Sequence, residues 1–169
     1  VTGNWRTITA DRARGPTFAL SWSPDGSRVF FHRHTDAPRG IFALPARGGE
    51  ERLVPADAGY PSAMPDGTLV VVRINADRQT QLHRFWPATG RVDPLPALVA
   101  TEASDAVVAP LPGGQQVAFI GRPLGSDRSS PGLYLLDVAT GQVDQLAREF
   151  AFREPAAVAA HPVDGTIFF

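Results

Sequence analysis

Alternation of apolar and polar residues marks short strands along most of the chain. The segment Ser21 to Phe31 (SWSPDGSRVFF) alternates on both sides of a Pro-Asp-Gly turn. A related sequence recurs at Ser62 to Val72 (SAMPDGTLVVV) and at Ala109 to Ile120 (APLPGGQQVAFI), and a shorter version (HPVDGTIFF) stands at the end of the chain. Period-two alternation bounded by turn residues is typical of β-strands joined in hairpins. The pattern therefore predicts an all-β fold.

Two interleaved series of turn glycines repeat along the chain at intervals of 41 to 51 residues: Gly26, Gly67, Gly114 and Gly165, and Gly3, Gly49, Gly90 and Gly141. In the first series, Pro presets φ, Asp can bond the backbone two residues on, and Gly takes a positive φ. One unit reads as strand, Pro-Asp-Gly turn, strand, longer loop, strand, Gly turn and strand. Four-stranded antiparallel units at this period are the signature of β-propeller blades.

The repeats predict a single propeller segment over residues 1–169, with blades near 18–54, 60–95 and 105–146 and partial blades at 1–9 and 155–169. The Ala-rich stretch 153–162 is interpreted as a first strand, because proline stands near both of its ends. The last residues, Phe168 and Phe169, would lie mid-sheet. Since natural proteins avoid apolar unpaired edges, we expect further blades from the parent chain or another chain, and self-association of the isolated segment.

The stretch FALSWSPDGSRVFFHR, followed by GIFALPARGGEERLV, resembles the TolB-type (WD40-like) β-propeller repeat. The shared pattern is an aromatic, Ser-Pro-Asp-Gly, an apolar strand, a loop with basic residues and Asp, a second apolar strand and a Gly turn. The resemblance covers nearly the whole chain. It implies a propeller that binds a protein or peptide partner, in a bacterial periplasmic or extracytoplasmic location.

Composition narrows the possible partners and chemistry. A formal net charge of −1 favours neither nucleic acid nor an anionic membrane surface as a partner. The chain has no cysteine, which excludes disulfides, thiolate metal sites and cysteine nucleophiles. No apolar run reaches the roughly 18 residues of a membrane span, so direct insertion into a membrane is not expected.

Catalytic signatures are not found in the sequence. It has no G-x-S-x-G elbow, no phosphate-binding Gly loop and no His-Glu metalloprotease motif, so no catalytic residue is assigned. Of the four histidines (His32, His34, His83 and His161), the first two share one face of a predicted strand and could form a metal pair. No carboxylate keeps a repeating position beside them, so structural roles are favoured, and no metal or cofactor is predicted.

Arginine and aspartate gather in the loop between the second and third strands of each repeat. The three sets are Arg33, Asp36 and Arg39; Arg73, Asp77 and Arg78; and Arg122, Asp127 and Arg128. Because such loops share the face of the blade connections, we expect them to ring one mouth of the channel, exposed and able to bind carboxylates. The alternative is that they pair within each loop, worth ~0–1 kcal/mol per pair.

The tryptophans favour packing over ligand stacking. Trp22 precedes the first Pro-Asp-Gly turn, where the resemblance places a residue packed between blades, and Trp86 ends a predicted third strand. Trp5, in the opening strand, is interpreted in the same way.

The leading hypothesis for function is a non-catalytic protein-interaction or scaffold module. The alternative is the substrate-gating propeller of a prolyl-oligopeptidase-family serine peptidase, and a propeller lyase that uses the histidines is weaker. The reading frame beyond Phe169 separates the first two. A G-x-S-x-G elbow would favour the peptidase, and further repeats would favour the binding module.

Overall fold

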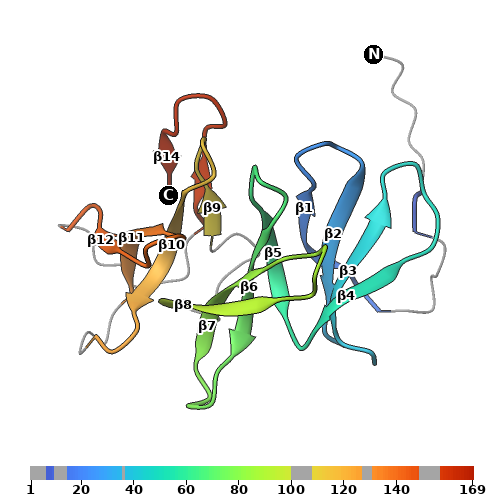
Figure 1. Ribbon diagram of the computed structural model, residues 1–169, viewed down its shortest axis with the longest axis horizontal. Coiled ribbons are helices and arrows are strands. Elements are labelled where there is room, and N and C mark those ends of the chain that lie inside the picture. Colours follow the sequence, from blue (N-terminus) through green and yellow to red (C-terminus); the bar gives the residue numbers. More distant parts are fainter. Residues whose placement is uncertain (1–6, 10–14, 36, 100–107, 127–130, 149–156) are drawn as a thin grey trace.

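The computed structural model describes residues 7–9, 15–35, 37–99, 108–126, 131–148 and 157–169 (Figure 1). All regular elements in these ranges are β-strands, paired antiparallel, and none is a helix. The described residues accordingly contain no helix able to cross a membrane. The sheets stand one after another with an open end at each side. The fold is an open-ended β-propeller segment, as the repeats predict.

Each blade is built from consecutive strands. Blade 1 contains β1 (Phe18–Trp22), β2 (Arg28–Arg33), β3 (Gly40–Pro45) and β4 (Arg52–Ala56). Blade 2 contains β5 (Gly59–Ala63), β6 (Leu69–Ile74), β7 (Thr80–Phe85) and β8 (Val92–Val99). Blade 3 contains β9 (Val108–Pro110), β10 (Gln116–Pro123), β11 (Gly132–Asp137) and β12 (Val143–Gln145). A separate two-stranded sheet follows, made of β13 (Ala159–Ala160) and β14 (Ile167–Phe168). The described end of the Ala-rich stretch is therefore a strand, as predicted.

The Pro-Asp-Gly turns have the predicted chemistry. The Asp25 carboxylate accepts the Ser27 N–H at 3.0 Å, and Gly26 has a φ of 67°. The Asp66 carboxylate likewise accepts the Thr68 N–H at 3.0 Å. The third turn lacks the aspartate, yet its Gly114 N–H still bonds the Leu111 carbonyl at 3.2 Å. Backbone geometry therefore persists where the side-chain bond is lost.

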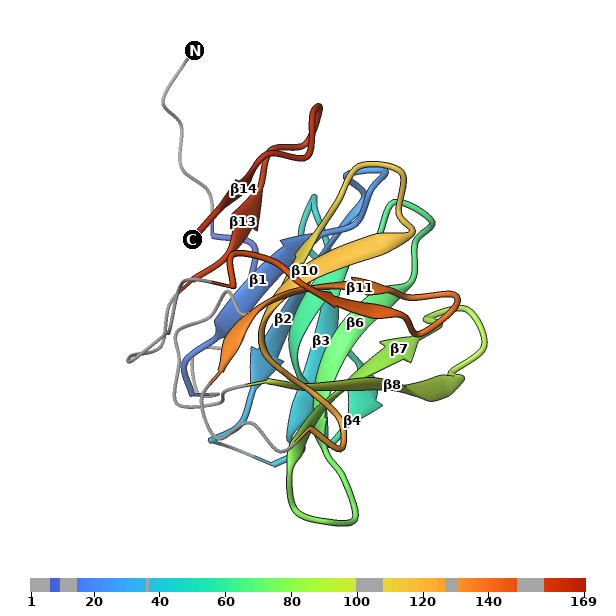
Figure 2. The same cartoon turned by 90° about the vertical axis from the view of Figure 1, so that its left-hand side faces the viewer.

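The core lies between the blades, because both faces of each sheet are apolar. In β6, Leu69 and Val71 pack towards blade 1, whereas Val70 and Val72 pack towards blade 3. Successive side chains of a strand point to opposite faces, so one continuous apolar run serves two interfaces. Strand β10 does the same between blade 2 and the β13–β14 sheet. Figure 2, viewed along the row of blades, shows the sheets one behind another.

Blades 2 and 3 are more closely joined than the repeat predicts. Strand β8 continues to Val99, and its end pairs with the end of β10, so that the two blades form one hydrogen-bonded sheet. Gly121 makes this approach possible, since a Cβ there would lie 2.0 Å from the Leu98 carbonyl oxygen. The blade boundary is set here by a close backbone crossing that the turn pattern does not reveal.

The repeated serine of the first strand links neighbouring blades. The Ser21 hydroxyl accepts the Ala63 N–H of blade 2 at 2.9 Å. Ser62, at the same repeat position, donates its hydroxyl to the Val108 carbonyl of blade 3 at 3.2 Å. These bonds satisfy backbone groups at the inner strands, where the sheets come closest.

Trp22 corrects one prediction. The sequence predicts that it packs between blades, but its side chain is 59% exposed. Leu20, two residues earlier, is 69% exposed. Ser21 faces blade 2, and alternation turns Leu20 and Trp22 to the opposite face of β1. No blade among the described residues covers that face. Trp5 lies outside the described residues.

Candidate functional site

A cleft of about 340 Å³ opens between blades 1 and 2 and includes residues of two predicted Arg-Asp sets. Its walls come from the end of β2 and the start of β3, from the β4–β5 connection, and from the adjacent ends of β6 and β7. Figure 1 shows these connections together at the lower side of the segment, opposite the Pro-Asp-Gly turns. The β2–β3 and β6–β7 connections therefore lie on the same face as the β4–β5 connection.

Two arginines from different blades line this cleft. Arg39, just before β3, is exposed, and Arg73, in β6, is half-buried. The Arg73 Nε donates to the Asp57 carbonyl oxygen at 3.4 Å, which ties β6 to the β4–β5 connection. Asp57 also lines the cleft and has a left-handed backbone with a φ of 51°. Among the described residues, two arginines and one aspartate therefore line the cleft.

A row of aromatic rings runs along one wall of the cleft, where His32, His34 and Tyr60 line it. Phe18 and His34 have ring centroids 4.7 Å apart, His34 and His32 5.3 Å, and His32 and Tyr60 5.3 Å. This row of rings runs from β1 through β2 to β5 in the next blade. Gly59 makes room for it, because a Cβ there would lie 2.7 Å from the His32 ring. The rings are thereby fixed against backbone that belongs to blade 2.

Sequence reasoning did not identify Asp57, Tyr60 and Thr80 as lining residues. A signal was available for Tyr60, which stands where the first repeat has Ala19. Both residues adopt a left-handed backbone, with φ values of 51° and 49°, and both lie in a bulge of the first strand. An aromatic residue at a bulged position next to a blade boundary indicates that its side chain helps to form a surface between the blades.

Arg33 does not have the exposure that the sequence predicts. Its Nη2 lies 3.1 Å from the Glu51 carboxylate, and the two side chains are only 4% and 8% exposed. Its Nη1 donates to the Gly15 carbonyl at 2.6 Å, and the guanidinium lies 5.3 Å from the Phe31 ring centroid. As the last residue of β2, Arg33 points to the blade face opposite its neighbour His32. It is a buried residue that pairs with Glu51, which lies outside its loop.

Three of the remaining predicted residues, Asp77, Arg78 and Arg122, are described and do not line the cleft. Asp77 and Arg78 are exposed on the β6–β7 turn, which is held by Asn75, whose Oδ1 accepts the Asp77 N–H at 3.0 Å. Arg122, at the end of β10, is half-buried. Asp36, Asp127 and Arg128 lie outside the described residues. The ring of three loop sets at one channel mouth stays a prediction.

Arg73 also affects a histidine on the neighbouring strand. His83 in β7 has its pKa lowered, first by burial and further by the positive charge of Arg73. Its Nδ1 lies 3.1 Å from the Gln81 carbonyl oxygen, a contact that acts in the opposite direction. His83 is therefore held in its neutral form near neutral pH.

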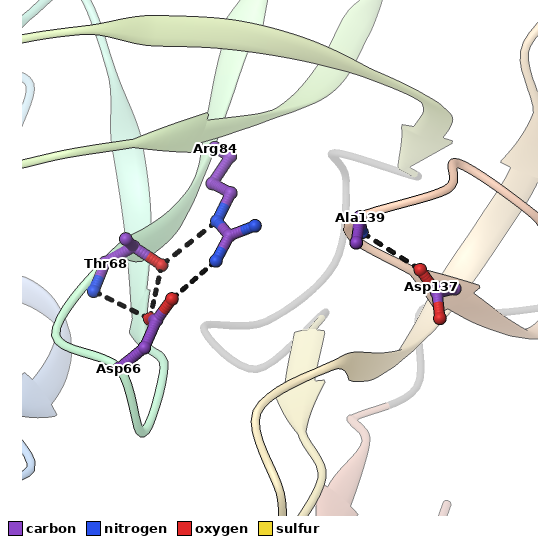
Figure 3. Close-up of polar contacts among 5 residues, drawn as sticks. All are labelled: Asp66, Thr68, Arg84, Asp137 and Ala139. Atoms are coloured by element: carbon purple, nitrogen blue, oxygen red, sulfur yellow. Dashed lines mark hydrogen bonds and ion pairs between the residues drawn. The ribbon is translucent and has the colours of Figure 1, made fainter.

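A second polar cluster lies at the other side of blade 2 (Figure 3). Arg84 donates from Nε to the Thr68 hydroxyl at 3.2 Å and from Nη2 to the Asp66 carboxylate at 2.5 Å. Burial alone would raise the pKa of Asp66, but the bonds from Thr68 and the charge of Arg84 lower it. The Trp86 ring lies 5.1 Å from the Arg84 guanidinium and 4.7 Å from that of Arg91. Trp86 is half-buried, which agrees with its predicted role in rim packing.

Blade 3 faces this cluster across a second cleft of about 370 Å³, which Arg84, Trp86 and Ala139 line. There the Asp137 carboxylate accepts the Ala139 N–H at 2.9 Å and the Thr140 N–H at 2.8 Å. These bonds lower the pKa of Asp137. The acidic groups of this region are therefore engaged in holding turns and arginines in place.

The histidines do not gather into a larger ligand set. Among the described residues, no group of three or more histidines and carboxylates is placed to hold a metal ion. His161 lies 2.9 Å from the Asp164 carboxylate on the last described turn, far along the chain from His32 and His34. The absence of a metal cofactor stays a prediction.

Known structures share the fold of this chain at low sequence identity. TolB from Acinetobacter baumannii matches with a TM-score of 0.66 and 17% identity, over 90% of this chain and 39% of that one. A putative TolB from Agrobacterium tumefaciens matches with a TM-score of 0.63 and 20% identity, over 82% of this chain and 50% of that one. A mutant of puromycin hydrolase matches with a TM-score of 0.72 and 20% identity, over 93% of this chain and 25% of that one.

These matches establish a propeller fold shared with TolB and with puromycin hydrolase. The chain spans half or less of the length of each of these structures. No family model matches the chain, and no curated protein matches it.

Proposed function

We propose that this chain is a non-catalytic interaction module that binds a protein or peptide partner in the cleft between blades 1 and 2. One observation carries the proposal: Arg39 and Arg73, from two different blades, line the same cleft. A guanidinium offers a planar pair of donors to a carboxylate, and such charge-assisted bonds are stronger than neutral ones. The partner is expected to present a carboxylate to this pair.

The fold supports this role. TolB propellers share the architecture, and a cleft opens between blades 1 and 2. Sheets on either side position the backbones of the two arginines, which lowers the entropic cost of binding. A periplasmic or extracytoplasmic location, as the repeat resemblance implies, is part of the same proposal.

The test is selection of peptides from a random library on the immobilised chain, followed by titration of the enriched sequences. Arg39→Ala and Arg73→Ala should each weaken binding, and so should high salt, because screening acts over ~8–10 Å at physiological ionic strength. Arg47→Ala is the matched control, since this exposed arginine follows the opposite end of β3. Enriched peptides that bind both cleft variants as tightly as the Arg47 variant would contradict the proposal.

The second candidate is the propeller of a prolyl-oligopeptidase-family serine peptidase. It is favoured by the match to puromycin hydrolase over 93% of this chain at a TM-score of 0.72. In that case the partner in the cleft would be a peptide substrate on its way to a hydrolase domain. Hydrolysis of aminoacyl-naphthylamides by the parent protein, together with a G-x-S-x-G elbow beyond residue 169, would support it. Further repeats in place of that elbow would exclude it.

A further inference from the structure

We propose that the cleft between blades 1 and 2 captures the C-terminal end of a peptide whose last side chain is aromatic or aliphatic. This inference rests on the proposed function and names the chemistry of its ligand. The Arg39 and Arg73 guanidinium groups would hold the terminal carboxylate, and the row of rings with the nearby apolar surface would hold the last side chain.

The charges in the cleft favour an anion. Among the described residues, the charged ones that line it are Arg39, Arg73 and Asp57. Arg73 is restrained by its bond to the Asp57 carbonyl oxygen at 3.4 Å, so its orientation is partly set before a ligand arrives. The exposed Asp57 carboxylate and the Thr80 hydroxyl remain at the same walls as acceptors for peptide N–H groups. The C-terminal residue of a peptide has both a carboxylate for the arginines and a backbone N–H for these acceptors.

The apolar surfaces lie beside these charges. The rings of His34, His32 and Tyr60 line one side, with successive centroids 5.3 Å apart. On this wall His34 is exposed and Tyr60 is half-buried. The exposed ring surface gains from covering by an apolar side chain, at about 25 cal/mol per Å² removed from water.

The size of the cleft argues for a chain end over an internal acidic residue. At about 340 Å³ it lies at the small end of ligand sites, which span ~300–1,000 Å³, so it accommodates one or two residues. A terminal carboxylate is bonded to the same Cα as its side chain, so both fit one small space. An internal Asp or Glu must also leave room for the chain to continue on both sides.

The experiment titrates the 169-residue chain with three synthetic probes, observed by NMR of the backbone amides and by calorimetry. The probes are acetyl-Ala-Ala-Phe with a free carboxylate, the same tripeptide as its C-terminal amide, and an amidated peptide with an internal glutamate. The free acid should bind at least about tenfold more tightly than its own amide, since the amide cannot form the charge-assisted hydrogen bonds of a carboxylate. It should also bind more tightly than the internal glutamate, because the chain must there continue on both sides. Shifts should gather at residues 57–60 and 72–74.

Variants assign the recognition to the cleft. Arg39→Ala and Arg73→Ala should each remove most of the preference for the acid over the amide, while Arg47→Ala retains it. Tyr60→Ser should weaken acetyl-Ala-Ala-Phe more than acetyl-Ala-Ala-Gly, because the serine removes aromatic contact without changing charge. Circular dichroism of each variant confirms that the fold is kept, as expected for side chains at the cleft surface.

The outcomes distinguish failure of this inference from failure of the proposed function on which it rests. Equal affinity for the acid and the amide, or stronger binding of the internal glutamate, overturns capture of a chain end. If library peptides still depend on Arg39 and Arg73 in that case, the proposed interaction site stands. If no probe and no library peptide depends on either arginine, both proposals fall.

Discussion

The Arg33–Glu51 pair offers a sharp test of how the structure differs from the sequence-based expectation. The sequence places Arg33 among exposed binding residues, where its loss would cost about half a kcal/mol. In the structure its guanidinium and the Glu51 carboxylate are 3.1 Å apart and almost fully buried. Arg33→Met keeps much of the side-chain volume but leaves the buried carboxylate without this guanidinium.

The expected cost of Arg33→Met is large. Removing one partner of a buried ion pair costs ~3–5 kcal/mol, because the remaining charge stays desolvated. For a chain of this size, 1 kcal/mol corresponds to ~2–4 °C in melting temperature, so the variant should melt roughly 6–20 °C lower. The guanidinium also bonds the Gly15 carbonyl at 2.6 Å, so loss of this contact adds to the cost.

A double-mutant cycle separates the pair from its surroundings. Glu51→Leu alone should also destabilise, whereas Arg33→Met combined with Glu51→Leu should recover most of the loss, since no unpaired charge then remains. Arg28→Met, an exposed arginine on the same strand, is the control and should change stability by less than about 0.5 kcal/mol. The free energies come from urea unfolding followed by fluorescence.

Two results would refute this reasoning. If Arg33→Met unfolds at the same urea concentration as Arg28→Met, the arginine is exposed, as the sequence suggested. If the double variant loses the sum of the two single losses, the residues act independently and the ion pair is not the cause.

Three further predictions follow from single positions. Gly59→Ala should lower the free energy of unfolding by ~1–3 kcal/mol and displace the His32 ring, because the new Cβ would contact that ring. Thermal melting measures the first effect and NMR of the imidazole the second, and an unchanged ring signal would argue against the close contact. The pKa of Asp25 is lowered to about 2, chiefly by the Ser23 hydroxyl. The stabilisation that this carboxylate contributes is therefore complete above about pH 4 and is lost as pH falls through 2. NMR titration should show a higher Asp25 pKa in Ser23→Ala, and an unchanged pKa would count against that bond. Trp22→Ala should cost less than ~1 kcal/mol, since the ring is 59% exposed, and a loss of several kcal/mol in a urea melt would show that the ring is covered.

Much of the fold could be predicted from the sequence because its causes are local. Alternation along a strand depends only on backbone geometry, so Leu69 to Val72 identify a strand with two apolar faces before any neighbour is known. The Pro-Asp-Gly turns are equally local, since the Asp66 carboxylate bonds a backbone group two residues away. Repetition of these signals along the chain then indicates stacked blades.

The candidate site could be predicted only in part. The sequence identified Arg39 and Arg73 as surface groups on corresponding loops, and the structure places both at one cleft. It could not show that the cleft lies between two blades, because that depends on how closely the sheets approach. Gly59 decides this distance, since the missing Cβ lets the His32 ring of blade 1 lie against the backbone of blade 2.

Exposure was decided by the tertiary structure alone. Arg33 and Arg73 occupy similar places in their repeats, yet only Arg33 is buried, because Glu51 and Gly15 lie far from it along the chain and close in space. Trp22 is apolar and at a packing position of its repeat, yet no described blade covers that face of β1. Local pattern determines which element forms and which way each side chain points, whereas long-range packing determines what, if anything, lies on the other side.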